Sequence, residues 1–175
     1  MDLKDILNED IIDLSVEGTN KEEVLTNMAN LLYKNGYIDN VEQFIKDIYK
    51  RESEGPTGMG SGISIPHGKS NAVKKIGICI GKTKNDIAWE TAMFSSGFQK
   101  TNLIFLFCVS VDTNFAENHM KLLSELAGKL GNEARVDALS KAKTKEEVVN
   151  LILCDDDKLD SVESSEEIVD LDIDF

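Results

Sequence analysis

The chain has 175 residues, of which 41% are apolar, and a formal net charge of −13. This length and composition predict one compact domain with an ordinary core, with or without a tail. An acidic surface is repelled by nucleic-acid phosphates and anionic lipids, so we expect no nucleic-acid partner and favour a cationic protein.

The N-terminal part of the chain predicts one strand and two helices. Apolar residues alternate in 12–16, which favours a strand. Apolar residues at helical spacing predict helices at about 20–35 and 40–51. Thr19 and Glu22 have the spacing of a capping box for the first helix.

The next stretch, residues 51–70 (RESEGPTGMGSGISIPHGKS), is the most unusual part of the sequence. It contains both prolines, five of the twelve glycines and His67, one of only two histidines. Glycine and proline impose special backbone conformations, so we predict a specified, non-repetitive loop. Arg51 lies at its mouth, and we interpret the loop as a candidate reaction site.

Two apolar, β-prone runs follow, at residues 76–81 and 103–110. Runs of this kind are typical of strands covered on both faces. The polar segment between them predicts a hairpin and loop, with Ile87 and Trp89 on a short strand.

Helical patterns then occupy 117–130, which carries His119 in its first turn, 133–142 and 144–154. Helices on both sides of a run of strands predict an α/β fold in which a mixed sheet lies between helical layers. We place this domain at residues 1–154.

The last segment, residues 155–175, contains ten acidic residues and one lysine. With few large apolar side chains, it predicts a disordered tail or linker. The N-terminus lacks the pattern of a secretory signal, and no apolar run reaches the length of a membrane span. The three cysteines form no CxxC pair, so we expect a cytoplasmic protein without disulfides.

The loop and the second histidine together predict phosphoryl chemistry. Neutral imidazole is a nucleophile at cytosolic pH, and phosphoryl transfer depends on positioning and on stabilising the phosphoryl oxygens. The candidates are His67 as the attacking group, with Arg51 and His119 beside it. A lone histidine in a turn is more often a surface residue, so the prediction depends on their joint presence. Further hydrogen bonds are expected from the loop residues Thr57, Gly58, Gly60, Ser61 and Gly62.

Three other interpretations fit less well. The segment from Gly62 to Gly68 encloses five residues where a P-loop needs four, and Pro66 removes an amide donor. The GMGSG run lacks the spacing of a dinucleotide site. The histidines and cysteines lack the short ligand spacing of a metal site, so we expect no metal and no nucleotide cofactor.

The residues also carry a family resemblance. RE followed by PTGMGSGISIPHGKS, and then HMKLLSELAGKL, resemble the fructose/mannitol class of enzyme IIA in the bacterial phosphoenolpyruvate-dependent sugar phosphotransferase system (PTS EIIA type 2). The resemblance covers about Leu3 to Leu153. It implies a three-layer α/β/α sandwich with a mixed sheet.

The resemblance also implies a role for each residue. His67 matches the histidine that accepts a phosphoryl group on Nε2 from the phosphohistidine of HPr and gives it to a cysteine of IIB. His119 matches the histidine that orients and hydrogen-bonds the phosphoryl group. Arg51 matches the arginine that stabilises its charge, a role that suits a planar guanidinium.

We therefore predict a phosphocarrier of a sugar phosphotransferase system, with phosphotransferase activity. Its expected partners are HPr, a IIB domain or subunit and, indirectly, the membrane permease IIC. Two alternatives stay open. One is a regulatory, nitrogen-type enzyme IIA that controls a protein partner through its phosphorylation state. The other is a metal-dependent hydrolase that uses both histidines.

Overall fold

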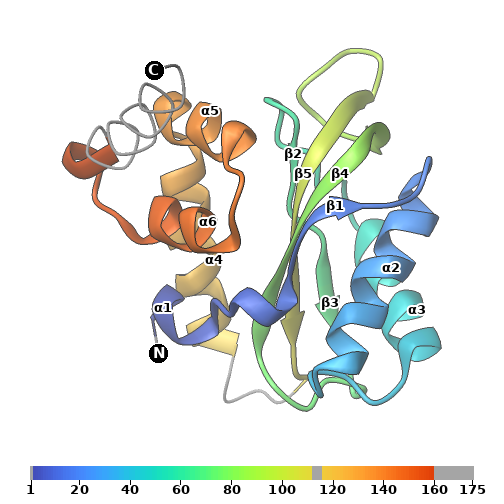
Figure 1. Ribbon diagram of the computed structural model, residues 1–175. Helices are drawn as coiled ribbons and strands as arrows, with labels where there is room; N and C mark the ends of the chain where they lie inside the picture. Colours follow the sequence, from blue (N-terminus) through green and yellow to red (C-terminus); the bar gives the residue numbers. More distant parts are fainter. Residues whose placement is uncertain (1, 112–115, 160–175) are drawn as a thin grey trace.

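One mixed sheet forms the centre of the molecule (Figure 1). The computed structural model describes residues 2–111 and 116–159. The strand order is β1-β4-β5-β2, and β3 also pairs with β5. β4 and β5 are antiparallel, whereas β1 is parallel to β4, and β2 and β3 are parallel to β5. The strands are β1 (Ile12–Val16), β2 (Ile63–Ser64), β3 (His67–Lys69), β4 (Gly77–Glu90) and β5 (Phe98–Val109).

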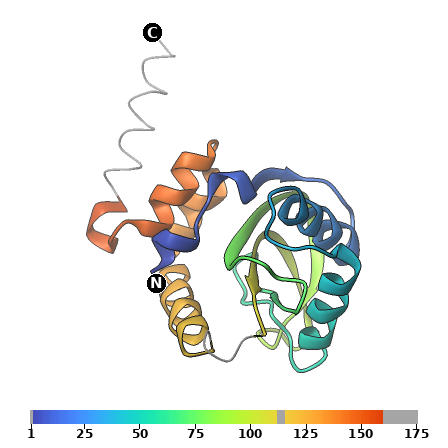
Figure 2. The same ribbon diagram turned by 90° about the horizontal axis from the view of Figure 1, so that it is seen from below.

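Helices cover both faces of this sheet, as Figures 1 and 2 show. One layer consists of α2 (Lys21–Lys34) and α3 (Val41–Glu52). The other contains α1 (Leu3–Ile6), α4 (Ala116–Leu130), α5 (Glu133–Lys141) and α6 (Lys145–Leu153). Short 3₁₀ turns lie between α1 and β1 (Glu9–Ile11) and after α6 (Asp156–Lys158). The expected α/β/α sandwich with a mixed sheet is confirmed.

The two cores follow from the alternation of side chains along the strands. On β5, Phe105 and Phe107 belong to the core beneath α4, α5 and α6, whereas Ile104 and Leu106 belong to the core beneath α2 and α3. Successive residues of a strand point to opposite faces, so a continuous apolar run supplies both cores.

The segment predicted as a non-repetitive loop contains two short strands, which corrects the sequence-based expectation. β2 pairs with Leu103 and Ile104, and β3 places His67 opposite Phe107. Neither strand has a periodic pattern of its own. They form because the free edge of β5 offers backbone partners that a local sequence pattern does not show.

The starts of the predicted helices agree with the structure except for the cap of α2, and the short helix α1 was not predicted. Its N-cap is Asn20, whose side chain accepts from the Glu23 N–H, and the Thr19 hydroxyl donates to Glu23. The predicted pair of Thr19 and Glu22 is therefore wrong by one residue, because asparagine is as good an N-cap as threonine. Thr144 caps α6 as expected.

The described packing continues past residue 154. Asp156 forms an ion pair with Arg135, and Leu159 is only 3% exposed within the core beneath α4 to α6. The domain boundary at residue 154 stays a prediction. The rest of the predicted tail, 160–175, lies outside the described residues. None of the described helices has the length and apolar character needed to cross a membrane.

Candidate functional site

His67 is the first residue of β3 and lies over the sheet on the α4 side. Its ring is stacked on Phe107, with 5.8 Å between ring centroids and an interplanar angle of 17°. The preceding Pro66 contributes its carbonyl, which accepts from the Phe107 N–H at 3.0 Å. The imidazole is only 9% exposed. β3 and β5 together therefore fix both the position and the tilt of this ring.

His119 reaches the same place from α4. Its ring centroid lies 5.5 Å from that of His67, with the two planes at 83°. Its ring centroid also lies 5.5 Å from that of Phe107, with the two ring planes at 80°. These three rings form one cluster, which we call the imidazole pair on Phe107. The structure therefore brings together two histidines that are 52 residues apart in the sequence.

Two positive charges act on the imidazole pair. Arg51 comes from α3, in the opposite helical layer, and its Nη1 donates to the Gly55 carbonyl at 3.2 Å. Lys69 lies two residues after His67 on β3, so the two side chains share one face of the strand. The charge of Arg51 acts on His67, and the charge of Lys69 acts on His119.

These surroundings keep both imidazoles neutral. Burial, followed by the neighbouring His119 and Arg51, lowers the pKa of His67 to about 4. The Ile65 carbonyl opposes this shift, although Nδ1 of His67 is buried without a hydrogen-bond partner among the described residues. Burial and Lys69 also lower the pKa of His119. At neutral pH His67 therefore keeps its nucleophilic lone pair.

The glycine-rich segment lies elsewhere on β5. The Gly62 carbonyl accepts from the N–H groups of Asn102 and Leu103, whereas His67 lies opposite Phe107. At a strand rise of 3.2–3.4 Å per residue, the four residues from Leu103 to Phe107 span roughly 13 Å. The structure therefore does not bring Gly62 beside His67, whereas the Thr57 carbonyl, at the other end of the segment, accepts from the Ile65 N–H at 3.0 Å.

Several donors of the segment are also occupied. The Gly58 N–H donates to the Glu90 carbonyl at 2.9 Å, and the Gly60 N–H donates to Gln99 Oε1 at 2.7 Å. Gly60, Ser61 and Gly62 all have positive φ, so the glycines serve a tight turn.

Thr57, the remaining member of the predicted phosphoryl loop, is buried away from solvent. Its hydroxyl donates to Glu52 and accepts from the indole N–H of Trp89, both at 2.9 Å. A direct contact between the phosphoryl group and Thr57, Gly58, Gly60, Ser61 or Gly62 stays a prediction.

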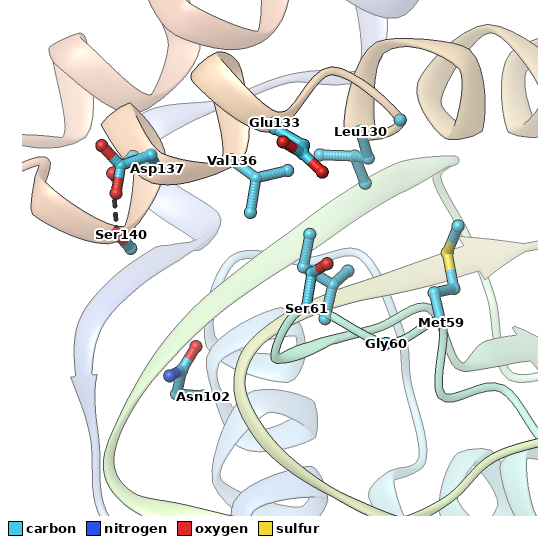
Figure 3. A pocket seen from close by; sticks show the side chains of 11 residues that line it. Met59, Gly60, Ser61, Asn102, Leu130, Glu133, Val136, Asp137 and Ser140 are labelled. Atoms are coloured by element: carbon cyan, nitrogen blue, oxygen red, sulfur yellow. Dashed lines mark hydrogen bonds between the residues drawn. The ribbon is translucent and has the colours of Figure 1, made fainter. Parts of the chain in front are cut away.

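The turn at 59–61 instead faces a hollow of about 510 Å³ (Figure 3). The opposite wall is the corner between α4 and α5, with Leu130, Glu133 and Val136. Two carboxylates, those of Glu133 and Asp137, line this hollow. It is therefore unsuited to an anionic phosphoryl group.

Two residues of the site were not predicted from the sequence. Phe107 is one of several apolar residues in a strand, and nothing local distinguishes it. Lys69 had a usable signal, because a residue two positions after His67 shares its face in any extended segment. A cluster of three or more potential metal ligands does not occur among residues 2–111 and 116–159.

Comparison with protein families agrees with this geometry. Residues 5–154 match the family model described as "Phosphoenolpyruvate-dependent sugar phosphotransferase system, EIIA 2". The chain belongs to this EIIA family. The expected family resemblance is confirmed, and membership supports a phosphocarrier role in a sugar phosphotransferase system.

Individual relatives extend the comparison. The chain is 29% identical over 158 residues to the 2-O-alpha-mannosyl-D-glycerate-specific EIIABC component of Escherichia coli, covering 90% of this chain and 23% of that protein. The chain thus spans about a quarter of this relative's length.

Among solved structures, nitrogen regulatory protein IIA-Ntr from Neisseria meningitidis is 26% identical, with a TM-score of 0.73, covering 85% of this chain and 97% of that one. The complex of enzyme IIAMTL and phosphorylated enzyme IIBMTL from Escherichia coli is 20% identical, with a TM-score of 0.67, covering 83% and 96%. The second likeness shows the shared fold.

Proposed function

We propose that this EIIA protein carries a phosphoryl group on His67, taking it from phospho-HPr and passing it to a cysteine of a IIB partner. The observation that carries the proposal is the imidazole pair on Phe107, with the centroids of the two imidazole rings 5.5 Å apart and the charges of Arg51 and Lys69 acting on them. A phosphoryl group is a dianion near neutral pH, and such surroundings favour it.

The transfer needs no external acid or base. Nδ1 of His67 is buried, which leaves Nε2 as the nitrogen that an incoming phosphorus atom can approach. The Nε2 lone pair forms the new N–P bond while the N–P bond of phospho-HPr breaks, and its electron pair returns to the HPr imidazole. In the second step a IIB thiolate attacks phosphorus, and the pair returns to Nε2.

Arg51 and His119 have separate roles in this scheme. Arg51 stabilises the negative charge that arrives on His67, and His119 donates a hydrogen bond that orients the phosphoryl oxygens. We expect His119→Ala to accept phosphate from phospho-HPr but to transfer it to IIB poorly. Normal onward transfer would remove the role assigned to His119.

The cofactor requirement, the partners and the cellular location that we propose follow from this chemistry. The energy arrives in the donor's phosphohistidine, so the reaction requires no metal or nucleotide at the site. The partners are HPr, a IIB domain or subunit and, through IIB, the membrane permease IIC. The solved complex of IIAMTL with phosphorylated IIBMTL supports a IIB partner. We place the protein in the cytoplasm, where these phosphoryl donors act.

The direct experiment is phosphorylation in a reconstituted system. Incubation with enzyme I, HPr and labelled phosphoenolpyruvate should label the protein through an acid-labile, base-stable bond. His67→Ala should abolish this label. If His67→Ala is labelled as well as the parent protein, the proposal is wrong.

A regulatory role is the second candidate, supported by the likeness to nitrogen regulatory protein IIA-Ntr. Both functions use the same histidine, so the discriminating observation is gene context. Neighbouring IIB and IIC segments favour transport, whereas an isolated or sigma-factor-linked gene favours regulation. The metal-dependent hydrolase requires stoichiometric metal after purification, and a metal-free protein that still accepts phosphate excludes it.

A further inference from the structure

A buried lysine that has no part in the proposed chemistry forms an ion pair with Glu52, the residue after Arg51. Lys21, the first residue of α2, is only 9% exposed. Its ammonium lies 2.5 Å from Glu52 Oε1 and 2.7 Å from Glu90 Oε2, and 4.7 Å from the centroid of the Trp89 ring. A buried ammonium is costly unless it is paired, so this arrangement needs a physical reason.

Glu52 connects this lysine to the turn that follows α3. Its Oε1 also accepts from the Thr57 hydroxyl at 2.9 Å, and Thr57 in turn accepts from the Trp89 indole N–H at 2.9 Å. We call Lys21, Glu52, Thr57 and Trp89 the Lys21 cluster. It joins α2, the end of α3, the turn and β4 into one polar network inside the fold.

The Lys21 cluster fixes the segment that holds Arg51. The hydrogen bond between Glu52 and Thr57 closes the turn at both ends, and within that turn the Gly55 carbonyl accepts from Arg51 Nη1 at 3.2 Å. Arg51 is also the residue directly before Glu52. If the hydrogen bond between Glu52 and Thr57 opens, the turn loosens, and the Gly55 carbonyl no longer holds the guanidinium of Arg51 in place.

We propose that Lys21 is a positioning residue for phosphoryl transfer, which acts through Glu52 and the 52–57 turn to hold the Arg51 guanidinium at the Gly55 carbonyl. The proposal rests on the proposed role of His67. The position of the Glu52 carboxylate depends on Lys21. The Glu52 side chain is only 5% exposed, and its Oε2 has no hydrogen-bond partner among the described residues, so the ammonium of Lys21 compensates for the burial of its charge. Without Lys21, the carboxylate must be protonated or move to water.

The first test compares Lys21→Met with the conservative Lys21→Arg. Lys21→Met should slow phosphoryl acceptance from phospho-HPr by about tenfold, as expected when a cationic contact is displaced but not removed. It should also raise the pKa of His67, measured by NMR titration of the imidazole, because the charge of Arg51 normally lowers it. Lys21→Arg keeps a buried cation and should recover most of both properties.

A double-mutant cycle then tests the route through Arg51. Arg51→Met should itself raise the pKa of His67, and adding Lys21→Met should cause no further rise, because the residue through which Lys21 acts is gone. If Lys21→Met raises the pKa of His67 equally in the parent protein and in the Arg51→Met variant, the proposal is wrong.

A folding control separates positioning from stability. Arg135→Lys weakens the opposite helical layer and should lower the melting temperature without changing the pKa of His67. Should Lys21→Met fail to fold, Thr57→Val replaces it, since it removes the hydrogen bond to Glu52 that closes the turn and leaves the ion pair between Lys21 and Glu52 in place. If the folded variant is destabilised but retains the parent pKa and acceptance rate, the Lys21 cluster is merely structural.

The two readouts also separate this proposal from the function on which it rests. If the parent protein is not labelled on His67, the proposed function fails, whereas the NMR titration still reports whether Lys21 places Arg51. If labelling is normal and Lys21→Met changes neither readout, only the positioning role fails.

Discussion

Gly68, the residue after the proposed phosphoryl acceptor His67, should not tolerate even a methyl group. A Cβ built at this position would lie 2.3 Å from both Cε1 and Cζ of Phe44, on α3. Ordinary carbon contacts begin near 3.5 Å, so the ring must retreat by about 1 Å. The ring is fully buried. We expect Gly68→Ala to cost about 1–3 kcal/mol of unfolding free energy, the usual range for overpacking.

Urea unfolding can measure this cost and identify its cause. The φ of Gly68 is not positive, so the penalty is steric and should be relieved by a smaller neighbour. Phe44→Leu in the Gly68→Ala background should therefore cost less than the sum of the single changes. Because α3 also carries Arg51, displacing this helix should raise the pKa of His67 as well.

Gly128 provides a matched control. It lies within α4, and a Cβ there would meet nothing within 4 Å. Gly128→Ala should stabilise the protein by up to about 1 kcal/mol through helix propensity. The steric argument is refuted if Gly68→Ala is as stable as the parent, or if its cost is unchanged when Phe44 is replaced.

Three further predictions follow from the charges of the structure. Folding lowers the pKa of His67 from 6.5 to about 4, so the unfolded chain binds the proton more readily. The free energy of unfolding should therefore fall by roughly 3 kcal/mol as the pH drops from 6.5 to 4. An equally steep fall of the unfolding free energy in His67→Asn would contradict this prediction. Lys69→Met should raise the pKa of His119 in an NMR titration, since the lysine charge lowers it. An unchanged value would place Lys69 too far away. Arg135 is fully buried and donates to the carbonyls of Lys129, Leu151 and Cys154. Arg135→Met should therefore lose about 3–5 kcal/mol in urea unfolding, with Arg135→Lys intermediate; a loss below 1 kcal/mol would refute this.

Much of the fold is encoded locally, which explains why it could be predicted. The helices at 20–35, 40–51 and 144–154 repeat apolar residues at helical spacing and carry good N-caps, so their ends fall within a residue or two of the observed ones. The strand at 12–16 was predicted from its alternation, and the cores of β4 and β5 were predicted from their continuous apolar runs. β4 and β5 extend beyond those runs, because their polar ends are held by cross-strand pairing.

The candidate site was likewise predicted only in part from the sequence. The motif around His67 and the second histidine identified three residues, Arg51, His67 and His119. The N–H groups of Gly58 and Gly60, however, donate to Glu90 and Gln99, and β2 pairs with the beginning of β5 and not with the part beside His67. A sequence motif shows which residues occur together along the chain, and only pairing partners show where each one lies.

The sequence by itself determined the fold class and the family and proposed His67 as the nucleophile, because each depends on residue type and local spacing. The tertiary structure decided the surroundings of His67. Phe107 and His119 come from a strand and a helix later in the chain, Arg51 comes from the opposite helical layer, and Lys21 supports it from within the fold. These contacts link residues far apart in sequence. Burial and charge, which set the pKa of His67, exist only when those segments are packed together.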